Sequence, residues 1–284
     1  MKKIPGYTIE NILGAGKFGY VYLAKENKKK RFIALKEKKR FAKRSIEEEM
    51  WFENEIKILD QMKVLDEKTG AWPENIIKYY EGWNDYEEQY ISFEYCKGGA
   101  LRYLIDGYKN KNESIPEEFI LSFLSQMIAG ISALHLNGFV HRAIKPHNIL
   151  IFEKQIMKIA GFGICTFDDL PVEKLEIPIL QPTLKKHNYV SPQVEMEKPY
   201  GAKCDIWSLG SILLEMMSQK NRLSLFAEIK SLYLQNKQEE INKLCKLKSY
   251  SQELCDIVCL MLQIDEKQRI GISSLNKLHF LQVK

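Results

Sequence analysis

The sequence predicts an α+β protein whose first third is rich in strands and whose remainder is mainly helical. Short apolar runs with strand spacing recur over residues 7–36 and 76–94. A long apolar face at helical spacing covers 116–137, and the run 205–217 is almost wholly apolar, which is typical of a buried helix. We expect one domain over 1–284 with two lobes, a strand-rich lobe over about 1–96 and a helical lobe over about 97–284.

Turn signals and apolar spacing define the elements of the strand-rich part. Strands are expected at 7–13, 20–24, 32–36, 76–83 and 89–94. Before the fourth strand, Ser45 and Glu48 have the spacing of a capping box and begin a helix. One face of this helix is marked by Phe52, Ile56, Leu59 and Met62. Residues 64–75 are expected to form a loop.

The helical part contains one long irregular segment. Gly138 is well placed to end the helix over 116–137. Residues 164–190 contain Pro171, Pro178 and Pro182 and show little periodicity. This pattern indicates a long loop, and loops of that length inside compact domains are often functional.

Composition narrows the class of protein. The net charge is +5, which is weaker than the positive charge expected of a nucleic-acid-binding protein. We therefore expect no nucleic acid as a partner. No Cys-x-x-Cys or zinc spacing occurs, and we interpret the cysteines as reduced thiols of an intracellular, cytoplasmic protein. They are Cys96, Cys165, Cys204, Cys245, Cys255 and Cys259. The sequence begins without a signal-peptide pattern and has no apolar run of membrane-spanning length, so we expect no membrane span.

Glycines at definite spacing lie between the first two expected strands. Gly14, Gly16, Gly19 and Val21 form a Gly-x-Gly-x-x-Gly-x-Val pattern. Glycines let backbone amides approach phosphate oxygens without an intervening side chain. A dinucleotide fold would place a helix next, whereas a strand is expected here, which argues against that fold. The alternative reading is a simple hairpin turn.

Further motifs follow in a fixed order along the chain. They are Ile33-Ala-Leu-Lys36, His141-Arg142-Ala143-Ile144-Lys145-Pro146-His147-Asn148, Lys158-Ile-Ala-Gly161-Phe162-Gly163, Ser191-Pro192-Gln193, Asp205-Ile-Trp-Ser-Leu-Gly210 and Arg269. With the glycine pattern, this series resembles the protein kinase family over roughly residues 7–280. The Lys-Pro-x-Asn form of the second motif resembles the serine/threonine branch.

The resemblance implies a bilobal kinase fold with a site for ATP or ADP. Lys36 would neutralise nucleotide phosphates and needs a carboxylate to hold it. We prefer Glu53, because the kinase pattern places its glutamate two residues before the Glu-Ile pair; Glu55 is the fallback, about 200° round the helix. The residues expected at the nucleotide are Leu13, Gly14, Gly16, Gly19, Val21, Ala34, Lys36, Glu53, Glu94, Cys96, Asn148 and Leu150.

Two positions depart from the family's chemistry. Ala143 stands where kinases have the aspartate that orients the acceptor hydroxyl, and a lost general base lowers a rate by about 10²–10⁴-fold. Gly161 stands where kinases have the aspartate that holds Mg²⁺, so Mg²⁺ binding is doubtful. Asn148 would offer one weak, partial ligand. Asp168 and Asp169 are possible substitutes that nothing in the sequence compels.

Other parts of the loop region are kept or altered. His141, Arg142 and Lys145 remain from the catalytic loop, but no catalytic residue is intact. In the family, the arginine at the position of Arg142 pairs with a phosphorylated residue of the activation loop. The resemblance implies Thr183 as that regulatory residue here. The alternative is that Arg142 only packs against its neighbours. Lys186 replaces a threonine of the family pattern, and Gln193 replaces the glutamate that pairs with Arg269.

These departures lead us to expect a pseudokinase and not an enzyme. It would bind nucleotide and act as a scaffold for a protein partner, an active kinase being one candidate. One alternative is a serine/threonine kinase with atypical or residual activity. The other is an active kinase inactivated by engineering, which aspartate codons at 143 and 161 would reveal.

Overall fold

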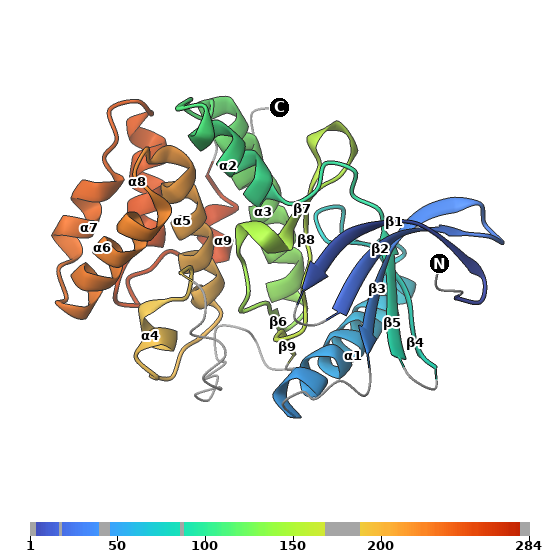
Figure 1. Cartoon of the computed structure of the whole chain (residues 1–284). Helices are drawn as coiled ribbons and strands as arrows, with labels where there is room; N and C mark the ends of the chain where they lie inside the picture. The colour runs from blue at the N-terminus through green and yellow to red at the C-terminus, as the bar shows by residue number, and fades with distance from the viewer. Residues whose placement is uncertain (1–3, 17–18, 40–45, 86–87, 168–187, 279–284) are drawn as a thin grey trace. The chain divides into compact units, whose positions relative to one another are not determined.

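The computed structural model describes residues 4–16, 19–39, 46–85, 88–167 and 188–278 (Figure 1). Its internal contacts divide the chain into two compact units. Unit 1 consists of Met1–Gly99 and Leu150–Ile164, and unit 2 of Ala100–Ile149 and Cys165–Lys284. The lobe boundary expected near residue 96 falls close to Gly99. The segment 150–164 was expected in the helical part and belongs with the sheet instead.

Unit 1 contains a five-stranded antiparallel sheet with the strand order β1-β2-β3-β5-β4. The strands are β1 (Tyr7–Gly16), β2 (Gly19–Glu26), β3 (Arg31–Lys39), β4 (Tyr79–Asn84) and β5 (Glu88–Glu94). Every strand expected from the sequence is present. The apolar core of the sheet is built on Ile4, Ala24, Ile33, Leu35 and Tyr90. These side chains are buried because apolar residues alternate with polar ones along the strands.

The helix of unit 1 is longer than the sequence indicated. It is α1 (Ile46–Thr69), so the loop expected from residue 64 was wrong. Residues 64–69 contain neither glycine nor proline, and the first helix breaker is Gly70. Gly70 has φ +76°, and its N–H donates to the Asp66 carbonyl at 2.7 Å, which is a glycine-ended helix terminus. Ser45 lies outside the described residues.

A small hairpin explains why segment 150–164 belongs to unit 1. It comprises β7 (Ile149–Ile151) and β8 (Met157–Ile159), joined through the 3₁₀ turn η2 (Glu153–Gln155). Ile77 N–H donates to the Ile159 carbonyl, and Ile159 N–H to the Asn75 carbonyl, both at 2.9 Å. A Cβ on Gly98 would lie 2.7 Å from Ile151, so this close approach requires glycine.

Unit 2 is mainly helical, as expected. Its helices are α2 (Leu101–Asn110), α3 (Glu117–Leu136), α4 (Pro192–Glu195), α5 (Lys203–Met217), α6 (Arg222–Leu234), α7 (Gln238–Cys245), α8 (Gln252–Met261) and α9 (Ile272–Leu275), with the 3₁₀ turn η1 (Pro146–Asn148). The short strands β6 (Phe139–Val140) and β9 (Thr166–Phe167) pair antiparallel. Gly138 ends α3 with φ +78°.

The two most apolar helices form the centre of unit 2. Every residue of α5 from Cys204 to Met217 is buried. By length and composition alone α3 would suffice to cross a membrane, but 56% of its apolar window is buried inside the structure. That burial is typical of the core helix of a globular unit.

Candidate nucleotide site and catalytic loop

The glycine turn joins β1 to β2 and is closed by the pair Gly16↔Gly19. Gly19 has φ +134°, and a Cβ there would lie 1.9 Å from the Glu37 carbonyl oxygen. Glycine is therefore required at 19 for packing against β3, whatever the turn binds. Gly14 has no atom within 4 Å of a Cβ position, so packing does not explain it. Its role at phosphate stays a prediction.

Lys36 on β3 lies beside the glycine turn, because its register partner on β2 is Val21. Its Nζ forms an ion pair with Glu55 Oε2 at 2.5 Å. Glu55 is buried and Glu53 is exposed, so the choice of Glu53 was wrong and the fallback is correct. The spacing from Phe52 could have indicated Glu55. Glu55 lies three residues after this buried apolar position of α1, and residues three apart share a helix face.

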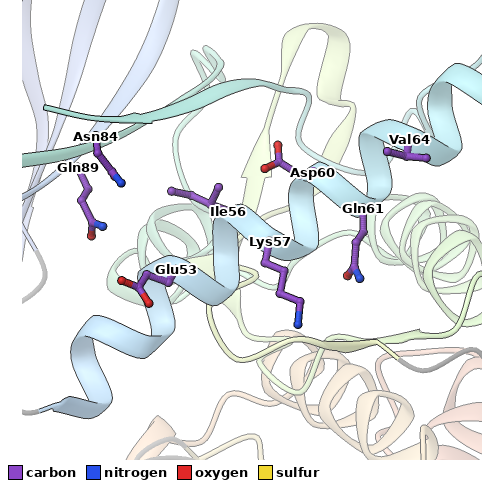
Figure 2. A pocket seen from close by; sticks show the side chains of 8 residues that line it. All are labelled: Glu53, Ile56, Lys57, Asp60, Gln61, Val64, Asn84 and Gln89. Carbon is purple, nitrogen blue, oxygen red and sulfur yellow. The ribbon is translucent and has the colours of Figure 1, made fainter.

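Glu53 lines a different cavity, on the exposed side of α1. Figure 2 shows its carboxylate there, beside Ile56 and facing the ends of β4 and β5. The helix turns by about 200° between residues 53 and 55. Because Glu55 faces Lys36, Glu53 lies on the outer side of the helix. The expectation that Glu53 takes part in nucleotide binding loses its geometric basis.

The other expected nucleotide residues of unit 1 differ in exposure. Val21, Ala34 and Leu150 are half-buried, and Leu13 is 42% exposed. These positions suit apolar contacts with a ligand, but their roles stay predictions.

Residues at the end of β5 are fixed by local contacts. The Glu94 carboxylate accepts the Lys78 N–H at 2.7 Å and pairs with Lys158 Nζ at 2.8 Å. Only the backbone of Glu94 is therefore available for a ligand. Burial raises the pKa of the Cys96 thiol to about 12, so this thiol is neutral near pH 7.

The segment around Gly161 is fixed to α1. Asn54 Nδ2 donates to the Gly163 carbonyl at 3.1 Å, and Phe162 is fully buried. Gly161 has φ +83°, a conformation that favours glycine and that aspartate tolerates better than most residues. The backbone is therefore held in place without a carboxylate at 161.

In unit 2, Asp205 of α5 holds the loop that begins at His141. Its carboxylate accepts the N–H groups of His141 at 2.9 Å and Arg142 at 2.8 Å, and it lies 3.0 Å from His135 Nε2. Burial alone would raise the pKa of Asp205, but the His135 hydrogen bond and the two histidines lower it below its ordinary value. An ionised, buried carboxylate therefore positions this loop.

Ala143 lies within the same loop and is buried. Its N–H donates to His141 Nδ1 at 3.2 Å, and its carbonyl accepts from Asn148 Nδ2 at 2.9 Å. That contact occupies the donor of the Asn148 amide and leaves Oδ1 as its ligating atom. Burial lowers the pKa of Lys145 in this loop. The ordered backbone surrounds a methyl group where the family pattern has a carboxylate.

Gln193 and Arg269 form a hydrogen bond, as expected from the replacement of a glutamate by glutamine at 193. Arg269 Nη2 donates to Gln193 Oε1 at 2.9 Å, and Gln193 Nε2 donates to the Ile264 carbonyl at 2.6 Å. Burial lowers the pKa of Arg269 to about 10. A hydrogen bond therefore replaces the ion pair of the family pattern.

Some predicted positions lie outside the described residues, namely Thr183, Asp168, Asp169 and Lys186. Arg142 is half-buried with φ +62°, and its pairing with Thr183 stays a prediction. Within the described ranges, no group of three or more His, Cys, Asp or Glu is placed to hold a metal ion.

A family model and several curated proteins match this chain over most of its length. The model of the family described as "Protein kinase domain" matches residues 7–281. The chain belongs to the protein kinase domain family. It is 28% identical to human serine/threonine-protein kinase Nek5 over 97% of this chain and 36% of that protein.

Two further relatives also carry kinase names. The chain is 28% identical to serine/threonine-protein kinase ATG1a of Arabidopsis thaliana over 78% of this chain and 34% of the relative. It is 27% identical to probable serine/threonine-protein kinase nek2 of Dictyostelium discoideum over 98% of this chain and 63% of the relative. The chain thus spans about a third of the length of the first two relatives and less than two thirds of the third.

These relatives contradict the expectation that this kinase domain is not an enzyme. They are named as serine/threonine kinases, and nothing in the described structure shows catalytic impairment. Loss of a general base lowers the reaction rate by about 10²–10⁴-fold, whereas enzymes accelerate reactions by at least about 10⁶-fold.

Proposed function

We propose that this domain is a serine/threonine protein kinase of atypical chemistry, which binds ATP and transfers its terminal phosphoryl group to a hydroxyl of a protein substrate. One observation carries the proposal: the ion pair between Lys36 and the buried Glu55, beside the glycine turn. A lysine held in this way presents a fixed positive charge to phosphate oxygens. The family match and the kinase names of the relatives support the same function.

The nucleotide-binding part relies on unit 1. Gly14 leaves open space above the turn, where phosphate oxygens meet backbone amides and Lys36. Val21, Ala34 and Leu150 supply half-buried apolar surface for the adenine ring, and the backbone from Glu94 to Cys96 supplies its hydrogen bonds.

The transfer step requires little covalent chemistry from the protein. The bond from the terminal phosphorus to its bridging oxygen breaks, a bond to the acceptor oxygen forms, and the hydroxyl proton passes to water. Because the transition state is loose, positioning and charge neutralisation supply most of the catalysis. In unit 2, Asp205 still positions the loop carrying Ala143 and Lys145. The missing carboxylate at 143 therefore slows transfer without abolishing it.

Mg²⁺ fits the residues of this chain poorly. Gly161 offers no side chain, and Asn148 offers one neutral oxygen, whereas Mg²⁺ favours carboxylates and phosphates. The transfer step proposed for this chain therefore does not depend on a metal ion held by the protein.

The test is transfer of labelled phosphate from ATP to a serine- and threonine-containing peptide library. We expect transfer by the purified chain and its loss in Lys36→Met. Lys28→Met, which alters an exposed lysine in the turn after β2, is the matched control and should keep full activity. No transfer above the Lys36→Met background would refute the proposal. Thermal denaturation with ATP then reports binding, since ligand a hundredfold above its Kd stabilises by about 2.7 kcal/mol.

The proposed activity and the cysteines bear on the partner and the compartment of this protein. An acceptor protein is the partner that this chemistry implies. The cysteines of the described residues are free thiols, most of them buried, which supports a reducing, cytoplasmic compartment.

A further inference from the structure

Basic side chains of unit 2 gather around the 3₁₀ turn η1. Arg102 and Lys109 belong to α2, which packs against η1, and Lys145 comes directly before this turn. Arg222 begins α6. Lys109 Nζ donates to the Lys220 carbonyl at 3.2 Å, two residues before Arg222. The end of α2 and the start of α6 are therefore held together in the same part of unit 2.

The carboxylates of this group are already engaged. Glu215 of α5 is fully buried, and its carboxylate accepts from Arg102 Nη1 at 2.8 Å and from Tyr189 Oη at 2.7 Å. Lys109 Nζ lies 4.0 Å from the same carboxylate. Asp106 accepts from Arg102 Nε at 3.0 Å. Because Arg102 contacts both carboxylates, a basic ligand would find little free negative charge here.

Two cations of the group have no such partner. The side chains of Lys145 and Arg222 are half-buried and make no ion pair or hydrogen bond within the described part of the chain. Burial lowers the pKa of Lys145, and no carboxylate among the described residues raises it. Ala143, two residues earlier, offers only a methyl group. These two positive charges are therefore uncompensated beside the catalytic loop.

The imidazole of His147 indicates the sign of the local charge. Burial lowers the pKa of His147, and the positive charges of Lys145, Arg102 and Arg222 lower it further. The negative charge of Asp106 acts in the opposite direction and does not prevail. The imidazole is therefore neutral near pH 7, and the surroundings of η1 favour an anion.

We propose that Lys145, Arg222 and Lys109 form a basic surface that selects protein substrates with glutamate or aspartate next to the acceptor hydroxyl. The substrate carboxylates pair with Lys145 and Arg222, whose charges have no partner within the described part of the chain. Charge-assisted hydrogen bonds of this kind are stronger than neutral ones, and charge complementarity disfavours a basic substrate. This inference names the substrate class of the proposed kinase and rests on that proposed function.

The experiment compares three peptides of equal length as phosphate acceptors for the whole chain with ATP. Each contains one serine, which is flanked on both sides by glutamate, by glutamine or by arginine. We expect kcat/KM for the glutamate peptide to exceed that for the glutamine peptide by about five- to tenfold, as two partly exposed ion pairs imply. The arginine peptide should have the lowest value. Raising the ionic strength should reduce these differences, because salt screens exposed charges.

Variants locate the preference. Arg222→Glu should abolish the preference for the glutamate peptide, and glutamate is well tolerated in the first turn of a helix. Arg222→Lys keeps the charge and should keep most of the preference. Lys248→Glu makes the same change of net charge at an exposed position in the turn between α7 and α8. This control should leave the preference unchanged.

Two results would overturn the inference while the kinase function stands. One is equal kcat/KM for the three peptides. The other is equal loss of the preference in Lys248→Glu, which would mean general attraction to a basic chain.

Failure of the proposed function gives a different result, namely no phosphate transfer to any of the three peptides. Fluorescence anisotropy with fluorescein-labelled forms of the same peptides then decides the inference. Tighter binding of the glutamate peptide that is lost in Arg222→Glu and kept in Lys248→Glu would support the basic surface. Equal binding of the three peptides, or no binding, would overturn it.

Discussion

The region of unit 1 around the glycine turn and the loop of unit 2 that begins at His141 keep different parts of the family's sequence pattern. In unit 1 the charged side chains are present, with Lys36 paired to Glu55. In unit 2 the backbone is present, held by Asp205, while residue 143 carries only a methyl group. The loop does not need its own carboxylate to take its conformation, because the buried Asp205 carboxylate accepts the backbone hydrogen bonds.

The largest expected effect comes from restoring the missing carboxylates. Ala143→Asp with Gly161→Asp should raise the rate of phosphate transfer by about 10²–10⁴-fold, the usual contribution of a positioned base. Gly161 tolerates the change because aspartate accepts a positive φ at modest cost. The measurement is initial transfer rate at saturating ATP, with Glu118→Asp as the control. An unchanged rate would show that the loop backbone is not positioned for catalysis.

Removing the carboxylate that holds the loop should cause the largest loss of stability. Asp205→Ala leaves the N–H groups of His141 and Arg142 without their buried acceptor, which should cost about 3–5 kcal/mol in the free energy of unfolding. Urea denaturation measures the loss. Asp256→Ala, at an exposed position of α8, should change the midpoint little.

Acid provides a second test of the same residue. The pKa of Asp205 is lower in the folded chain than in the unfolded chain, so its contribution is full above pH of about 4 and is lost as pH falls through the folded pKa. Asp205→Asn should therefore lose less stability than the wild type on acidification below pH of about 4. Parallel acid curves for the two proteins would contradict the role of the ionised carboxylate.

A smaller effect separates the two glutamates of α1. Glu55→Gln removes the buried counter-charge of Lys36 and should weaken ATP binding about tenfold. Glu53→Gln should change ATP affinity by less than about twofold, since Glu53 lies on the opposite face. Isothermal titration of both variants decides between them, and the reverse order would reinstate the sequence-based choice.

The smallest effect concerns a tie inside unit 2. Gln193→Glu offers Arg269 an ion pair but loses the donor to the Ile264 carbonyl. These terms oppose each other, so the free energy of unfolding should change by about 1 kcal/mol or less. A larger gain by thermal denaturation would mean that the carbonyl contact contributes little.

Several features of this protein were predictable from its sequence because they depend on local spacing. Alternating apolar residues gave all five strands, and the order of motifs gave the kinase fold. The tie between Gln193 and Arg269 was also predictable, since it needed only the pattern of residue types. The end of α1 was missed, although Gly70 was visible as its first breaker.

Tertiary packing decided the features that depend on which side of an element faces inward. Glu55 and not Glu53 binds Lys36, because α1 turns Phe52, Leu59 and Met62 towards the interior and carries Glu55 with them. The same rotation opens the cavity around Glu53 on the outer face. The sequence by itself determined which chemical groups are present at 143 and 161. Which groups face one another was decided only when the elements packed, because such pairing joins residues distant along the chain.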